Sequence, residues 1–90
     1  MKSSLITVTG LVQGVGFRWS TKRLADQNNI TGWVRNDQSG AVIIRAEGAD
    51  PDMAIFLSAI KHGPSPFARI DSVTVTSQAP ESFRQFFISN

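Results

Sequence analysis

A glycine-rich segment, residues 12–18 with the sequence Val-Gln-Gly-Val-Gly-Phe-Arg, carries the residues in this chain that are best suited to chemistry. Gly14 and Gly16 permit backbone conformations that other residues rarely adopt, so consecutive N–H groups can turn toward a common point. The helix expected after them adds unpaired N–H groups and the positive end of its dipole. Arg18 adds a planar set of donors that matches phosphate or carboxylate oxygens. The segment therefore predicts an anion-binding cradle.

Other interpretations of the same segment are weaker or remain open. A Walker loop requires Gly-x-x-x-x-Gly-Lys-Ser/Thr, which does not occur in the chain. A dinucleotide fingerprint requires a third small residue at the position that Trp19 occupies. The plain alternative is a glycine-rich turn between a strand and a helix that binds nothing.

The remaining chemistry is sparse. The chain has no cysteine, no tyrosine and a single histidine, His62, which we interpret as a capping residue on the surface of a helix end. Disulfides, thiolate catalysis and Cys- or His-rich metal sites are thus excluded, and a nucleophile–base triad is not expected. Arg18 can neutralise a phosphoryl group, while Asn36 can hold a water through its amide. A phosphoryl transfer with a loose transition state and a carboxylate leaving group requires little more.

Composition bounds the class of protein. Ninety residues with 41% hydrophobic content predict one globular domain over residues 1–90, too short to divide into two cores. No apolar run approaches the length of a membrane helix, and we expect a soluble, cytoplasmic, monomeric protein without membrane partners. The net charge is +2, but residues 1–36 contain five of the basic residues and a single acid, Asp26. This asymmetry can steer a small anion toward the glycine-rich segment, although Lys22 and Arg23 fit a solvated helix face equally well.

Hydrophobic periodicity places that segment between a strand and a helix. Alternating or helical patterns predict, in order, a strand over 5–12, a helix over 18–28, strands over 30–36 and 41–47 joined by a turn at 37–40, a second helix, a strand over 70–76 and a short strand within 83–88. Asp50 and Pro51 are expected as N-cap and first residue of the second helix, which Gly63 and Pro64 end. The predicted inward faces comprise Ile6, Val8 and Val12; Phe17, Thr21, Leu24, Ala25 and Asn28; Val42, Ile44 and Ala46; and Met53, Phe56, Leu57 and Ile60.

The two tryptophans and the aromatic residues of the last strand are harder to place from the sequence. We interpret Trp33 as a core residue of its strand. Trp19 lies off the apolar stripe of its helix, so it either lines the mouth of the loop or is simply exposed. In the last strand, both Phe86 with Ile88 and Phe83 with Phe87 fit an inward face.

The order β-α-β-β-α-β predicts an α+β fold: a ferredoxin-like sandwich of one antiparallel sheet with two helices on one face. The connections between the first and second strands and between the third and fourth would be right-handed crossovers.

Residues 12–18 together with residues 32–36, Gly-Trp-Val-Arg-Asn, resemble the paired motifs of the acylphosphatase family, and the resemblance extends over the chain to Gly40 and Gly48. It implies a hydrolase that needs neither metal nor cofactor and cleaves the carboxyl–phosphate bond of small acyl phosphates, with inorganic phosphate as product and ligand. Arg18 would bind the phosphate and Asn36 would orient the attacking water. The cradle would consist of the backbone N–H groups of Gln13, Gly14, Val15, Gly16, Phe17 and Arg18.

Two rivals use the same features. The string from Gly14 to Trp19 resembles an RNA-binding motif, but that motif lies on a third strand, whereas this string is expected to leave the first strand and enter a helix. We therefore predict no nucleic-acid partner. Acylphosphatase-like domains also occur within large hydrogenase-maturation proteins that handle carbamoyl phosphate. Because this chain ends after one domain, we expect the free enzyme.

Overall fold

The computed structural model describes residues 1–89. Within them, the strands and helices follow one another in the order that the periodicity predicts. The elements are β1 (Lys2–Leu11), α1 (Phe17–Gln27), β2 (Thr31–Asn36), β3 (Val42–Gly48), α2 (Asp50–His62), β4 (Arg69–Ser77) and β5 (Phe86–Ile88). No helix in this part of the chain combines the length and hydropathy needed to cross a bilayer.

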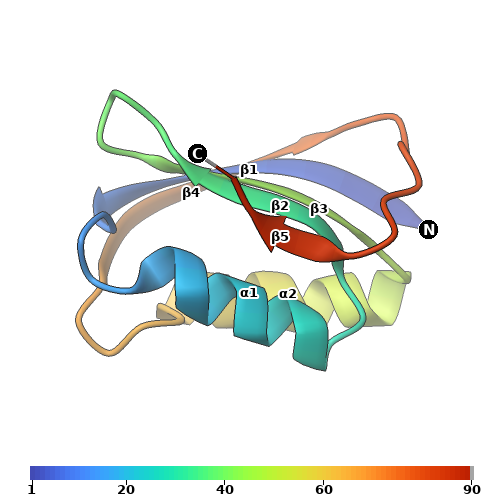
Figure 1. Cartoon of the computed structure of the whole chain (residues 1–90), viewed down its shortest axis with the longest axis horizontal. Coiled ribbons are helices and arrows are strands. Elements are labelled where there is room, and N and C mark those ends of the chain that lie inside the picture. Colours follow the sequence, from blue (N-terminus) through green and yellow to red (C-terminus); the bar gives the residue numbers. More distant parts are fainter. Residues whose placement is uncertain (90) are drawn as a thin grey trace.

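The strands form one sheet in the order β4-β1-β3-β2-β5, with α1 and α2 side by side on the same face (Figure 1). The pairs β1–β3, β1–β4 and β2–β3 are antiparallel. The predicted ferredoxin-like α+β fold is therefore confirmed. In one detail the sheet differs from the antiparallel sheet that was predicted: β5 runs parallel to β2, with Phe86 paired to Gly32, so the complete sheet is mixed.

The core lies between the sheet and the helices, and the predicted inward faces form it. Residues buried there come from every element except β4: Ile6, Val8, Phe17, Ala25, Val34, Val42, Ile44, Ala46, Met53, Phe56, Ile60 and Phe86. The register of β5 is settled by Phe86, which is 2% exposed and packs against Phe56 with ring centroids 6.4 Å apart. Phe87 consequently points to the other face and is exposed.

Two predictions were wrong in detail. The N-cap of α2 is Ala49, not Asp50: its backbone is extended and its carbonyl accepts the N–H of Met53 at 2.9 Å. Asp50 is therefore already inside the first helical turn, where its charge complements the helix dipole. Trp33 does not join the core, because it alternates with the buried Gly32 and Val34. It is half-buried on the open face of the sheet, with the Arg35 guanidinium 5.4 Å from its ring centroid.

That open face carries a buried ionic cluster. Arg45 and Glu47 lie on the same face of β3, and the Arg45 Nη2 atom is 3.7 Å from the Glu47 Oε2 atom. Glu47 is completely buried. The Glu47 carboxylate accepts the Ser3 hydroxyl at 2.9 Å and the N–H groups of Glu81 and Ser82 at 2.6 and 3.0 Å. Burial raises the pKa of Glu47, but these donors outweigh it and hold the pKa below its ordinary value. The cluster fastens the β4–β5 connection to the sheet.

Candidate active site

A small pocket at one end of the sheet contains most of the predicted site residues. Its volume is about 180 Å³. It is lined by Val12, Gly14, Gly16, Phe17, Arg18, Trp19, Asn36 and Ile88. The structure thus brings Arg18 and Asn36 together with both loop glycines, from segments that are far apart in the sequence. Gln13 and Val15, which belong to the predicted cradle, are not among the lining residues.

Backbone conformation explains the two glycines. Gly14 and Gly16 both have φ of 76°, in the left-handed region, and Gly16 is the N-cap of α1. A Cβ at either position would meet nothing within 4 Å, so the requirement for glycine comes from the backbone and not from lack of space. No side chain caps the first turn of α1. The helix therefore begins at the pocket with its first N–H groups directed at the loop side.

The Gln13 side chain ties this loop to the turn after β2. Its Nε2 atom donates to the carbonyl oxygens of Asp37 at 2.8 Å and Ala41 at 2.9 Å. Asp37 immediately follows Asn36, and Ala41 follows the turn over residues 37–40. One side chain therefore fixes the glycine-rich loop relative to the end of β2.

A second tie comes from the segment between α2 and β4. The Ser65 hydroxyl, which is buried, donates to the Val15 carbonyl at 2.6 Å. The carbonyl and N–H on either side of one trans peptide bond point in opposite directions. With the Val15 carbonyl held by Ser65, the N–H of Gly16 is turned away from Ser65.

Asn36 occupies the last position of β2, paired with Val42 of β3. Its Oδ1 atom is buried and has no hydrogen-bond partner among residues 1–89. A buried amide oxygen without a partner is costly and marks a place where a ligand or water is expected. The following residue, Asp37, has a local role: it accepts the hydroxyl and N–H of Ser39 at 2.6 and 3.1 Å, which lowers its pKa.

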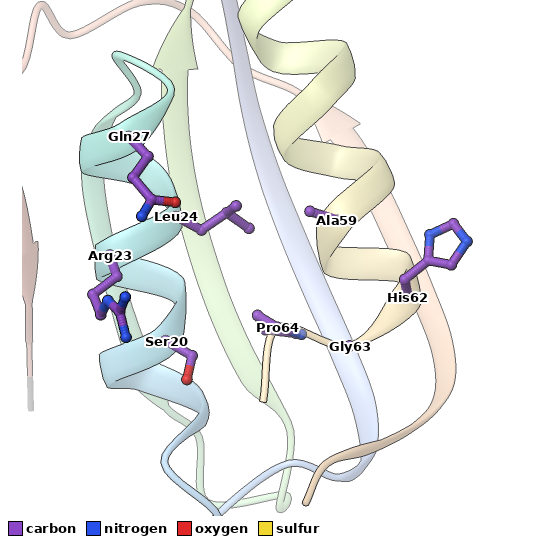
Figure 2. Close-up of a pocket in the computed structure, with 8 residues that line it drawn as sticks. All are labelled: Ser20, Arg23, Leu24, Gln27, Ala59, His62, Gly63 and Pro64. Carbon is purple, nitrogen blue, oxygen red and sulfur yellow. The ribbon is translucent and has the colours of Figure 1, made fainter. Parts of the chain in front are cut away.

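A larger pocket of about 390 Å³ lies between the helices, away from these residues (Figure 2). Leu24 of α1 and Ala59 of α2 point toward each other across it, whereas the ring of His62 points away. His62 is exposed, and its Nδ1 atom lies 2.8 Å from the Ser58 carbonyl, in keeping with the predicted capping role. Size alone does not make this groove the site, because the glycine-rich loop and Asn36 do not reach it.

Comparison with known proteins concerns the chain as a whole and identifies its family. The family model for acylphosphatase matches residues 5–88. The chain belongs to the acylphosphatase family. It is 48% identical over 77 residues to the acylphosphatase of Leuconostoc mesenteroides, covering 86% of each protein. The crystal structure of acylphosphatase from Bacillus subtilis superimposes with a TM-score of 0.96 at 38% identity, covering 100% of both chains.

Membership of the acylphosphatase family makes the chain an enzyme that hydrolyses acyl phosphates. The chain also resembles part of full-length HypF in its phosphate- and nucleotide-bound form, with a TM-score of 0.93 at 32% identity. That match covers 99% of this chain but 12% of the larger one. The string from Gly14 to Trp19 lies in a loop and a helix, and not on β3, where an RNA-binding motif would lie.

Ile88 and Ser65 were not predicted as contributors to the site, whereas Trp19 was predicted either to line the mouth of the loop or to be exposed. Ile88 lines the pocket because β5 lies beside β2, and the aromatic pattern of the last strand leaves its register open. Trp19 both lines the pocket and remains exposed, so the two interpretations of this residue hold together. No local sequence pattern indicates the role of Ser65, because its hydrogen-bond acceptor, the Val15 carbonyl, is 50 residues away in the chain.

Proposed function

We propose that this acylphosphatase-family enzyme cleaves the carboxyl–phosphate bond of small acyl phosphates without a metal, by direct attack of water. The water oxygen forms a bond to phosphorus while the bond between phosphorus and the acyl oxygen breaks. The electron pair of the broken bond leaves with the carboxylate, and the water proton goes to the phosphate or to solvent. A carboxylate is a stable leaving group, so the reaction needs no general acid.

Asn36 carries the proposal. Its buried Oδ1 lacks a partner in the part of the chain that the structure describes, and Asn36 lines the same pocket as Arg18 and the loop glycines. An amide oxygen accepts a hydrogen bond from water, and this bond orients the water oxygen toward a phosphoryl group in the pocket. Holding the nucleophile in line is the main demand of such a reaction. This supports Asn36 as the residue that positions the water.

Arg18 and the loop would hold the phosphoryl group. The guanidinium supplies charge and paired donors, and the positive end of α1 starts at the same pocket. The N–H groups of residues 13–18 would complete the cradle, with Gln13 and Ser65 fixing the loop from outside. In the transition state, negative charge shifts toward the leaving oxygen, and these donors would stabilise the phosphoryl group as it does so.

Hydrolysis of acetyl phosphate by the purified, chelator-treated protein tests the proposal. We expect consumption of acetyl phosphate well above that with heat-denatured protein, and no increase when Mg²⁺ is restored. Inorganic phosphate should inhibit competitively. Activity that appears only with Mg²⁺ would overturn the metal-free mechanism, and activity equal to the denatured control would overturn the function.

A further inference from the structure

This inference rests on the proposed function. The size of the pocket around Arg18 and Asn36 determines which part of a substrate it can enclose. Pockets that enclose whole drug-sized ligands measure about 300–1,000 Å³. The pocket around Asn36 measures about 180 Å³. A phosphoryl group and a water are small enough for that space. The acyl group of the substrate must therefore lie at the rim.

The rim can be identified by elimination among the lining residues. Val12 and Phe17 are each 1% exposed, so their side chains belong to the core beneath the pocket. The two lining glycines have no side chains, and Arg18 and Asn36 are engaged in the proposed chemistry. Among the lining residues that the structure describes, two side chains remain, and both are large, apolar and accessible: Trp19 is 61% exposed and Ile88 is 36% exposed.

These two residues come from different elements. Trp19 belongs to the first turn of α1, directly after Arg18, and Ile88 is the last residue of β5, paired with Val34 of β2. The matched neighbour Phe87 lies on the same strand as Ile88, is exposed, and does not line the pocket. Exposed tryptophan is unusual because its large apolar surface favours burial. An apolar acyl group would cover part of that surface when the phosphoryl end is bound.

We propose that Trp19 and Ile88 form an apolar rim that selects acyl phosphates with aromatic or extended aliphatic acyl groups over acetyl phosphate. Contact with the acyl group removes apolar area from water, and an aromatic acyl group adds ring–ring attraction with Trp19.

Paired substrates test the rim. The ratio of kcat/KM for benzoyl phosphate to that for acetyl phosphate should exceed one in the parent enzyme. Trp19→Ala should lower kcat/KM for benzoyl phosphate by about two- to ten-fold, the range measured for aromatic contacts, while changing that for acetyl phosphate by less than about two-fold. Trp19→Phe should retain most of the preference, and Ile88→Ala should lower it. Phe87→Ala should leave the ratio unchanged.

The same assays separate this inference from the proposed function. Inhibition by inorganic phosphate, which has no acyl group, should stay constant in Trp19→Ala. A parent that hydrolyses neither substrate would overturn the proposed function. A parent that hydrolyses both, with the same ratio in Trp19→Ala and Ile88→Ala as in the parent, would overturn the rim alone. An equal fall in Phe87→Ala would do so too, by showing that the effect is not specific to the lining residues.

Discussion

Arg18 and Asn36 meet in one pocket, and their proposed roles differ in a way that kinetics can resolve. In the proposed mechanism, Asn36→Ala removes an amide that would contact the nucleophile, but leaves Arg18 and the loop that would hold the phosphoryl group. We expect turnover to fall by about 10²-fold or more, as when other positioned polar groups are lost, while inhibition by phosphate stays within a few-fold of the parent. Arg18→Gln should instead weaken phosphate inhibition and turnover together. Rates and inhibition constants measured on the same preparations check this contrast.

The competing explanation for Asn36 is structural, because the residue ends β2 immediately before the 37–40 turn. Asn28→Ala is a matched control: it removes an asparagine whose Nδ2 donates to the Leu24 carbonyl at 2.8 Å, at the end of α1. This control should lower the melting temperature and leave turnover per folded molecule unchanged. If Asn36→Ala behaves in the same way, melting early but turning over normally, Asn36 does not position the water.

Individual residues also show where sequence patterns succeed. Gly14, Gly16 and Arg18 could be predicted as neighbours because they lie within five consecutive residues of one loop. The glycines indicate its unusual backbone conformation, and the arginine indicates its charge. Asn36 could be joined to them through the paired motifs of the family. Ile88 could not, since its place depends on which strand β5 joins and in which register.

Among the elements, the segment between α2 and β4 has an unexpected function in the site. Ser65 is 4% exposed and its hydroxyl holds the Val15 carbonyl, which orients the next N–H of the loop. Ser65→Ala leaves that carbonyl without its donor, at a cost of about 1–3 kcal/mol. We expect weaker phosphate inhibition and a higher KM, with a smaller change in kcat because Asn36 is untouched.

Ser72→Ala provides the matched control for loss of a serine hydroxyl. Its hydroxyl is hydrogen-bonded to Thr9 between β4 and β1, outside the pocket. The change should leave phosphate inhibition at the parental value. Ser65→Ala with parental phosphate inhibition and an altered melting temperature would show that Ser65 stabilises the fold without orienting the loop.

The strands and helices were largely predictable, because hydrophobic residues recur with a period of about 2 or 3.6 wherever one side of an element faces the core. The prediction failed where a large apolar residue does not face the core. A large aromatic side chain within a strand predicts a core residue at Trp33, but the neighbouring Val34 takes the inward position and Trp33 stacks with Arg35 on the open face. Lys2, Ser3 and Ser4 extend β1 beyond its predicted start, because the strand pairs there with residues 46–48 of β3.

At the scale of the whole molecule, the two faces of the sheet are stabilised differently. The helix-covered face packs apolar side chains, whereas the open face buries Glu47 with hydrogen bonds from the β4–β5 connection. That connection leads into β5, which supplies Ile88 to the pocket. The Glu47 cluster therefore links the stability of the fold to the strand that completes the site.

Acid pH should weaken this cluster. The pKa of Glu47 is below its ordinary value of 4.5 in the folded protein, so the unfolded chain takes up a proton at higher pH than the folded one. The stabilisation is therefore complete above pH 4.5 and is lost as the pH falls through the folded pKa. Glu47→Gln removes the charge at every pH. It should cost about 1.5–3 kcal/mol near neutrality, the range for hydrogen bonds to charged groups.

Urea unfolding of the parent and Glu47→Gln, from neutral pH down to pH 3, measures this difference. The two curves should converge at acid pH, because protonation of the parent removes the same charge that the substitution removes. Glu81→Gln is the control: Glu81 is 63% exposed and lies 3.9 Å from Arg45, so its loss should cost no more than about 1 kcal/mol. Curves for Glu47→Gln and the parent that stay parallel down to pH 3 would show that Glu47 does not set the acid limit of the fold.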